Sequence, residues 1–285
     1  MNTNDFKIFQ AVADLGSFTK AAAATFTVQS NVTARIKSLE DEFGAEFFVR
    51  NSRKVTLTAE GRMLMPYARR IVKLVEDAKS SVMGTDKVSG TIKVGCIETT
   101  MALKVPEILT SFEHQYPDVE LEFKSGMRAD LIREVLSFSL DAAFVSGPLN
   151  VAGLNEVNVK EENLVIINAV KGPALKDLLK MQPLKIVVFA EGCVFRARLE
   201  AYLSYAGVNQ YKSTVLNSIE GIINFVEAGL GISLMPEEVI NHYYASREIK
   251  THKLTKQLGT MNTVLVFREQ EEQSLALKAF IKLYQ

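Results

Sequence analysis

Hydrophobic residues at the start of the chain recur with the spacing of three successive α-helices. The first helix is predicted between Asn4 and Leu15, with its cap at or just before Asn4, and Gly16 ends it. A second, short helix can begin at the cap residue Ser17 and contains a run of alanines. The third helix is expected from about residue 29 to 43, and its apolar stripe is Val32, Ile36, Leu39 and Phe43. The pattern predicts a helical module in which this stripe is buried.

The opposite face of the third predicted helix carries short polar groups around small residues. This exposed set consists of Gln29, Ser30, Asn31, Thr33, Ala34 and Lys37. Glutamine, asparagine and serine can hydrogen-bond to base edges in the DNA major groove, and an alanine or threonine methyl can contact thymine. The third helix is therefore predicted to enter the major groove of double-stranded DNA.

Residues 47–57 alternate apolar and polar side chains about a basic tip, which indicates a two-stranded wing. Arg50, Arg53 and Lys54 are predicted to contact phosphates, which provides affinity and orientation but no direct sequence information. On charge alone, an alternative interpretation is a three-helix packing module whose lysines and arginines are only solvated. The spacing of particular residues decides between the two interpretations.

These residues span the first 61 positions: Gly16-Ser17-Phe18-Thr19, Ala21-Ala22, Gln29-Ser30-Asn31-Val32-Thr33, Ile36, Leu39-Glu40, Gly44, Phe48, Arg50 and Leu57-Thr58-Ala59-Glu60-Gly61. In this order and register they resemble the N-terminal signature of LysR-type transcriptional regulators. Thr25 and Thr27 depart from it, because the family usually has an apolar or aromatic residue there. The resemblance implies a winged helix-turn-helix over residues 1–58 and a sequence-specific, DNA-binding transcriptional regulator.

A long helix is predicted to start near Ala59, with Thr58 as its cap, and to end by Gly84. One of its sides carries Leu64, Tyr67, Ile71, Leu74 or Val75, Ala78 and Val82. We expect this side to form a dimer seam; the alternative is a helix that lies on its own domain. Pro66 should kink the helix or loosen its first turns. Residues 59–90 are thus interpreted as a linker, a dimerisation helix and a hinge.

From residue 91 to 285 short apolar strands alternate with helical stretches, which predicts an α/β domain with two parallel βαβ lobes. The first lobe is expected over about 91–150 and 265–285, and the second over about 151–264. A final strand near 263–267 and a helix from about Glu271 are predicted to return to the first lobe, so that two hinge strands connect the lobes. Such a domain binds small molecules at the carboxyl ends of its strands.

The landmarks Phe112 to Pro117, Gly126, Leu140-Asp141, and Glu227 to Ile232 followed by Pro236 make this region similar to the LysR effector domain. That domain is itself similar to type II periplasmic binding proteins. The resemblance implies a small-molecule co-inducer and a homodimer or homotetramer that bends DNA between two neighbouring sites.

Side chains at the predicted strand ends are candidates for contact with the effector. They are Thr99, Thr100, Arg128, Ser146, Phe195, Arg196 and Ser218. Hydroxyls and free backbone N–H groups favour an anionic or polar ligand, and the family places a ligand-contacting Ser or Thr at Thr99 and Thr100. The alternatives are that the hydroxyls only cap helices, that Phe195 is core and that Arg196 is a surface charge.

The net charge of zero does not by itself suggest a nucleic-acid partner, so the distribution of the charges along the chain matters more. Residues 1–90 hold 13 Lys and Arg against 10 Asp and Glu, so the segment predicted to bind DNA is slightly basic. The two cysteines, Cys96 and Cys193, are far apart, and buried packing is favoured over a thiol sensor or a disulfide. The three histidines are scattered, so no metal, cofactor or catalytic set is expected.

No secretory signal and no apolar run of roughly 18 residues is visible, so a cytoplasmic protein without a membrane partner is expected. A solute-binding protein would carry a signal peptide and no wing. An α/β enzyme with an accessory DNA-binding domain is also disfavoured, because Gly229-Leu230-Gly231 lies at a helix end and does not open one. The expected partners are double-stranded DNA, a second copy of the chain and a small-molecule effector.

Overall fold

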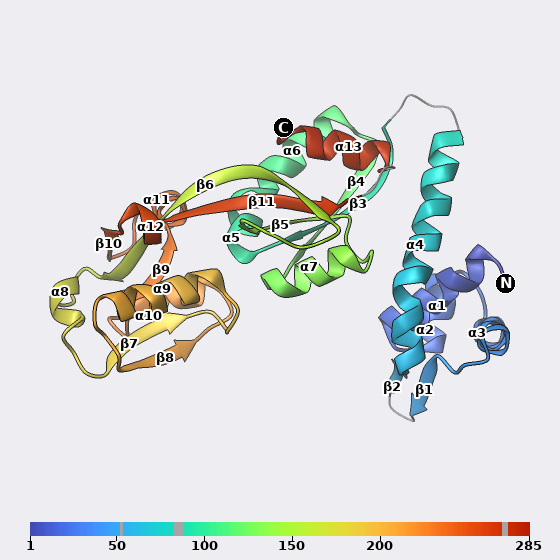
Figure 1. Cartoon of the computed structure of the whole chain (residues 1–285), viewed down its shortest axis with the longest axis horizontal. Helices are drawn as coiled ribbons and strands as arrows, with labels where there is room; N and C mark the ends of the chain where they lie inside the picture. The colour runs from blue at the N-terminus through green and yellow to red at the C-terminus, as the bar shows by residue number, and fades with distance from the viewer. Residues whose placement is uncertain (52–53, 83–87, 270–272) are drawn as a thin grey trace. The chain divides into compact units, whose positions relative to one another are not determined.

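The computed structural model describes residues 1–285 except 52–53, 83–87 and 270–272 (Figure 1). It divides into two compact units, residues 1–90 with 136–139, and residues 91–135 with 140–285. Within the described residues, no helix is both long and apolar enough to cross a membrane.

The first unit is a helical module followed by a hairpin and a long helix. Its elements are α1 (Thr3–Leu15), α2 (Phe18–Ala24), α3 (Gln29–Phe43), β1 (Phe48–Asn51), β2 (Lys54–Leu57) and α4 (Ala59–Val82). The cap of α1 is Asn2 and not the predicted Asn4 or Thr3, because Asn2 and Asp5 bond to each other's backbone N–H. Gly16 and Gly44 end α1 and α3 in the left-handed conformation, with φ of 61° and 65°. The predicted order of three helices and a hairpin is confirmed.

Aromatic rings form the centre of this unit. Phe9 lies 5.5 Å from Phe47 and 5.3 Å from Phe48, measured between ring centroids. Val32, Ile36 and Leu39 of α3 are buried against the same core, as predicted. The prediction that Phe43 is buried with them was wrong: it lies at the last position of α3 and is 48% exposed, with its ring 5.7 Å from that of Phe47. The exposed polar face of α3 is thus held on a rigid support.

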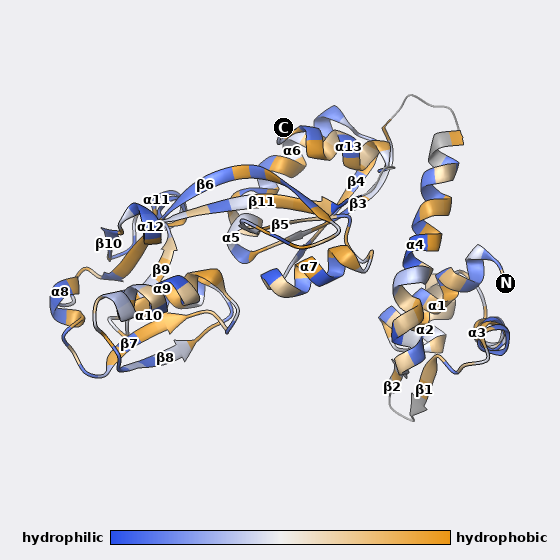
Figure 2. Ribbon diagram, in the orientation of Figure 1, coloured by the Kyte–Doolittle hydropathy of each residue, from blue (hydrophilic) through white to orange (hydrophobic). Residues whose placement is uncertain are grey.

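Helix α4 begins where Thr58 Oγ1 accepts a hydrogen bond from the Gly61 N–H at 2.9 Å, and it continues through Pro66. Hydrophobic and hydrophilic residues alternate along it (Figure 2). Leu64, Met65, Ala68 and Val72 are buried in the core of the first unit. Leu64 was expected in the dimer seam, and the structure corrects this. A second apolar set stays exposed: Met63, Tyr67, Leu74 and Val82.

The second unit contains the remaining elements. In the first lobe these are β3 (Gly90–Cys96), α5 (Glu98–Leu103), α6 (Val105–Gln115), β4 (Val119–Ser125), α7 (Arg128–Leu136), β5 (Ala142–Gly147) and α13 (Leu275–Lys282). In the second lobe these are α8 (Leu175–Leu178), β7 (Leu184–Val188), α9 (Val194–Tyr205), β8 (Tyr211–Val215), α10 (Ile219–Glu227), β9 (Ser233–Pro236), α11 (Glu237–Tyr243), β10 (Ile249–Lys253) and α12 (Lys256–Gly259). The long strands β6 (Leu154–Ala169) and β11 (Thr260–Arg268) run between the lobes (Figure 1).

The strands form a mixed sheet in the order β10-β6-β11-β5-β3-β4, with β9 beside β6, and a separate parallel pair β7-β8. The two-lobed α/β fold and the two connecting strands are confirmed. The expectation of wholly parallel lobes was wrong, because β11 is antiparallel to both β5 and β6. The first half of β6, residues 154–163, is polar and partly exposed, so its sequence lacks the apolar run that marks a buried strand.

Candidate effector site and nucleic-acid interface

Most of the side chains predicted to read DNA lie on the open face of α3. Gln29, Ser30, Ala34 and Lys37 are exposed, whereas Asn31 and Thr33 are half-buried. Thr19 Oγ1 donates a hydrogen bond to Gln29 Oε1 at 3.1 Å, which leaves the amide N–H groups of Gln29 free to donate to an acceptor such as a base edge.

Asn31 is held differently, because its Nδ2 donates to Thr27 Oγ1 at 2.9 Å. This contact fixes the turn before α3 and accounts for the polar residue at Thr27, where the family has an apolar one. One turn further along α3, Arg35 Nη1 lies 3.3 Å from Oδ1 of the buried Asp5. Asp5 also caps α1, so this ion pair sets α3 against α1.

The predicted wing is the antiparallel hairpin β1-β2, in which Arg50 faces Val55 and Asn51 faces Lys54 in the strand register. For Arg50 and Lys54 only the backbone is described, and Arg53 lies outside the described residues. The structure therefore confirms the hairpin, and the phosphate contacts of these three residues stay a prediction.

In the second unit a cavity of about 60 Å³ lies between the two lobes. We call it the crevice cavity; it is lined by Ile97, Glu98, Gly126, Met127, Arg128, Ser146, Phe189, Gly192, Cys193, Val194 and Phe195. Three predicted effector contacts meet here: Arg128, Ser146 and Phe195. Arg128 lies at the start of α7, Ser146 near the end of β5 and Phe195 at the start of α9. Their convergence agrees with the prediction that side chains at strand ends lie close together.

Arg128 is the cation of the crevice cavity. Its Nε donates to the carbonyl oxygen of Ser146 at 2.8 Å and its Nη2 to that of Pro148 at 3.4 Å. Carbonyl oxygens do not neutralise a guanidinium, so the positive charge remains available to a ligand. Two helices, α7 and α9, also begin at the cavity wall, and the N-terminus of a helix favours an anion.

Four predicted effector contacts do not line the crevice cavity. Thr99 and Thr100 are buried in α5, directly after the lining residues Ile97 and Glu98, and Thr99 Oγ1 has no hydrogen-bond partner among the described residues. Arg196 pairs with Glu200, at 2.9 Å between Nε and Oε1. Ser218 is exposed and accepts a bond from the Gly221 N–H, so in this structure it serves as the cap of α10.

Neither cysteine resembles an activated thiol. Cys96 is fully buried in β3, and burial raises the pKa of its thiol. Cys193 lines the crevice cavity, and burial raises the pKa of this thiol as well, although N–H groups of Phe195 and Arg196 oppose the shift. A raised pKa lowers the fraction of reactive thiolate at neutral pH. The geometry thus favours the packing role expected from the sequence.

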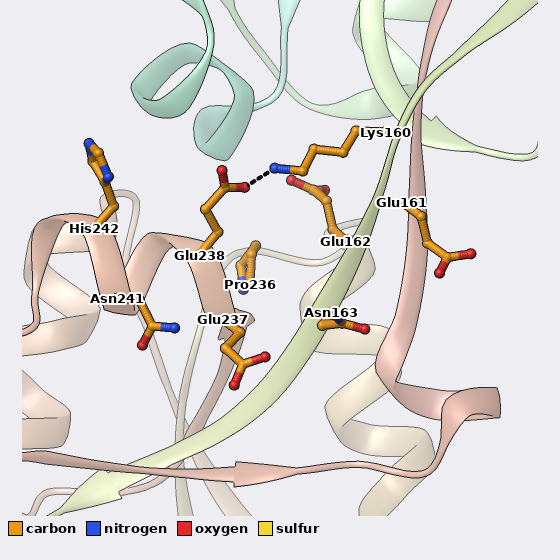
Figure 3. A pocket seen from close by; sticks show the side chains of 9 residues that line it. All are labelled: Lys160, Glu161, Glu162, Asn163, Pro236, Glu237, Glu238, Asn241 and His242. Atoms are coloured by element: carbon orange, nitrogen blue, oxygen red, sulfur yellow. Dashed lines mark hydrogen bonds and ion pairs between the residues drawn. The ribbon is translucent and has the colours of Figure 1, made fainter.

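A second and larger cavity, of about 360 Å³, lies between β6 and α11 (Figure 3). We call it the hinge cavity; it is lined by Lys160, Glu161, Glu162, Asn163, Pro236, Glu237, Glu238, Asn241 and His242. Lys160 bridges to Glu238, and Lys253 Nζ lies 3.5 Å from Glu237 Oε1. The buried Glu162 accepts a bond from Thr263 Oγ1 at 2.8 Å. Most carboxylates of the hinge cavity thus contact side chains of neighbouring strands. None of the predicted effector residues lines this cavity.

Two family models match the chain. One, described as "Bacterial regulatory helix-turn-helix protein, lysR family", matches residues 3–62, and the other, "LysR substrate binding domain", matches residues 85–285. The chain belongs to the LysR family. This LysR-family protein is a transcriptional regulator with a DNA-binding module and an effector domain, as the sequence predicted.

Curated relatives and solved structures agree with the assignment to the LysR family. The HTH-type transcriptional regulator CzcR of Bacillus cereus is 36% identical over 282 residues, which are 99% of this chain and 96% of that protein. The regulator GltR of Bacillus subtilis is 32% identical over 281 residues, covering 99% and 95% of the two chains.

Among solved structures, full-length OxyR from Pseudomonas aeruginosa aligns with a TM-score of 0.78 at 21% identity, covering 100% of this chain and 93% of that one. CbnR in complex with its target DNA aligns with a TM-score of 0.68 at 21% identity, covering 100% and 99%. These structures show that the LysR fold extends over the whole chain.

Several residues that line the crevice cavity of this LysR-family protein were not predicted from the sequence. Met127, Gly192 and Val194 each stand next to a lining residue or a predicted one, and Ile97 and Phe189 end strands or follow them. Extending each strand end through the turn to the start of the next helix would have found them. Their apolar character shows that the cavity is more hydrophobic than the predicted hydroxyls and arginines suggested.

Proposed function

We propose that this regulator binds double-stranded DNA through α3 and the β1-β2 wing, and that a small anionic effector in the crevice cavity controls the binding. In this proposal residues 1–58 are the DNA-binding domain, 59–90 the linker and 91–285 the effector domain. Because its target is the chromosome, we place the protein in the cytoplasm, and we assign it no catalytic role.

The observation that carries the effector proposal is the convergence of Arg128, Ser146 and Phe195 on one cavity between the lobes. The guanidinium of Arg128 and the starts of α7 and α9 favour a negatively charged group, while Phe195 and its apolar neighbours favour a hydrocarbon body. Thr99 Oγ1, buried without a described partner, is a further donor that an effector can engage if α5 shifts. The proposed effector is therefore a small carboxylate with an apolar body.

Base reading is assigned to the open face of α3. We expect Gln29→Ala to weaken binding to a duplex from the promoter region of the chain's own gene by roughly tenfold or more, since a bidentate base contact contributes about 1–3 kcal/mol. Ser38→Ala, also on α3 and exposed, serves as the matched control. Equal affinity of wild type, Gln29→Ala and Lys37→Ala in a gel shift would exclude this face of α3 as the reader.

Pairing of two chains is assigned to the exposed stripe of α4. Met63, Tyr67, Leu74 and Val82 are between 61% and 85% exposed and recur at helical spacing, which is the pattern of a helix that packs on a second helix. Two linked DNA-binding units reading neighbouring half-sites gain affinity and specificity. Leu74→Asp is expected to shift the protein to the monomer in sedimentation; a wild-type monomer at working concentration contradicts the proposal.

Control by an effector is tested with the same promoter duplex. A thermal-shift screen of the full chain against small carboxylates and neutral analogues of equal size identifies a ligand, and gel shifts with and without that ligand measure its effect on DNA. The proposal predicts that carboxylates raise the melting temperature and that their neutral analogues do not. Equal shifts with both classes would contradict the anionic effector.

A further inference from the structure

One flexible side chain, that of Met127, reaches across the crevice cavity. Met127, in the turn between β4 and α7, faces Gly192, in the turn between β7 and α9 of the other lobe. A Cβ added to Gly192 would lie 3.7 Å from Met127 Cε, which is ordinary van der Waals distance. The methionine therefore spans the crevice from one lobe to the other.

The backbone on the Met127 side is fixed by hydrogen bonds. The Gly126 N–H donates to the Cys96 carbonyl at 3.0 Å, and the Leu131 N–H donates to the Met127 carbonyl at the same distance. The turn also packs closely on α7, since a Cβ added to Gly126 would lie 3.0 Å from Leu131 Cδ2. Movement at this position is thus left to the Met127 side chain.

The backbone on the opposite side is also fixed. Gly192 has a φ of 89°, in the left-handed region that favours glycine, and the next residue, Cys193, donates its N–H to the Ala190 carbonyl at 3.3 Å. Because Gly192 has no side chain, only its backbone atoms line the cavity opposite Met127. The Met127 side chain therefore bridges the gap between the two lobes at this point.

We propose that Met127 sets the upper size of the group that can enter the crevice cavity, and so acts as a specificity-determining residue for the effector. This inference rests on the proposed function in that it concerns the same site. At about 60 Å³ the cavity is well below the roughly 300–1,000 Å³ of ordinary ligand pockets. Methionine has three rotatable side-chain bonds and no branch, so it can yield to a group of fitting shape.

Cys193 offers a measurement that needs no effector, because its thiol lines the same cavity beside Gly192. The full chain is alkylated at about pH 8.5, where more thiolate forms, with reagents of rising size: iodoacetamide, N-ethylmaleimide and N-phenylmaleimide. Mass spectrometry of the peptide that contains Cys193 gives each rate separately from that of the fully buried Cys96.

In the wild type the rate at Cys193 is expected to fall steeply from iodoacetamide to N-phenylmaleimide, relative to the rates with free cysteine. Met127→Ala should raise the relative rate of N-phenylmaleimide roughly tenfold, because the crevice is then open to an aromatic ring. Met127→Leu, of similar volume, should stay near the wild type. Met181→Ala removes a half-exposed methionine elsewhere in the second lobe and serves as the control.

An unchanged ratio of the three rates in Met127→Ala would overturn the proposal, as would wild-type rates that show no dependence on reagent size. Circular dichroism confirms that each variant is folded, and Met127→Val provides a second shortened side chain. These outcomes concern the steric role of Met127 alone. Failure of the proposed function would be seen in a different experiment, as gel shifts that do not respond to any effector. The alkylation rates and the gel shifts therefore distinguish the two failures.

Discussion

The hinge cavity and the crevice cavity, both in the effector domain, differ in size and in lining. The hinge cavity, at about 360 Å³, is about six times as large as the crevice cavity, at about 60 Å³, yet several of its charged groups already have partners. Lys160 pairs with Glu238 (Figure 3), Glu237 with Lys253, and Glu162 accepts a bond from the Thr263 hydroxyl. The crevice cavity is mostly apolar, and among the described residues its arginine donates to the carbonyl oxygens of Ser146 and Pro148. Volume alone would favour the hinge cavity, whereas the state of the polar groups favours the crevice cavity, which is the effector site in our proposal.

Position in the fold explains this difference. The hinge cavity lies against β6, one of the two strands that connect the lobes, and Lys160 and Glu162 of that strand bind Glu238 and Thr263. These contacts hold the connecting strands in place. The crevice cavity lies where two turns and two helix starts from different lobes converge, so a ligand there contacts both lobes at once. Closure of the lobes can then depend on the ligand.

The largest expected effect is on the crevice cavity. Arg128→Ala removes its cation and should weaken binding of a carboxylate effector roughly 10- to 100-fold, since a hydrogen bond to a charged group contributes about 1.5–3 kcal/mol. Arg133→Ala, on the same helix α7 but 74% exposed and paired with Asp130, is the matched control. Isothermal titration calorimetry of both variants checks this. Unchanged affinity in Arg128→Ala would remove the distinction between the cavities.

A smaller effect is expected when the hinge cavity loses its central cation. Lys160→Met should lower the free energy of unfolding by about 1 kcal/mol or less, because Lys160 and Glu238 are each about one third exposed or more and solvent screens their attraction. The effector affinity should not change. Urea unfolding and calorimetry measure the two quantities on the same protein, and a loss of effector binding in Lys160→Met would assign a ligand role to the hinge cavity.

The smallest effect concerns Glu162, where burial raises the pKa of the carboxyl group. The folded state then binds a proton more tightly than the unfolded state, so stability falls as the pH rises from the unfolded pKa through the folded one. Glu162→Gln removes this loss and keeps an acceptor for Thr263 Oγ1. We expect it to raise the melting temperature slightly at pH 7, with the gain disappearing below about pH 4, near the ordinary pKa of glutamate. A gain that is independent of pH would contradict the assignment.

The DNA-binding module could be predicted closely because its determinants are local. The stripe from Val32 to Leu39 and the glycine at position 44 fix the bounds of α3 within one stretch of sequence. The strand β6 was not predicted, because residues 154–163 are stabilised by pairing with β11, about 100 residues further along the chain. A strand that depends on distant partners shows no hydrophobic period of its own.

The effector site was predictable only in part, for a related reason. Arg128, Ser146 and Phe195 could be placed because strand ends converge in an α/β fold. The role of Met127 could not, since it depends on the absence of a side chain at Gly192 in the other lobe. In the same way, the capping role of Ser218 and the pairing of Arg196 with Glu200 depend on neighbours that the residue type alone does not reveal.

The most direct test of the account is a crystal structure of the full chain with the carboxylate that most raises its melting temperature. We expect electron density for the ligand in the crevice cavity, with its carboxylate at Arg128 and its apolar body against Phe195. Density between β6 and α11, at Glu237 and Glu238, would contradict it and make the hinge cavity the effector site.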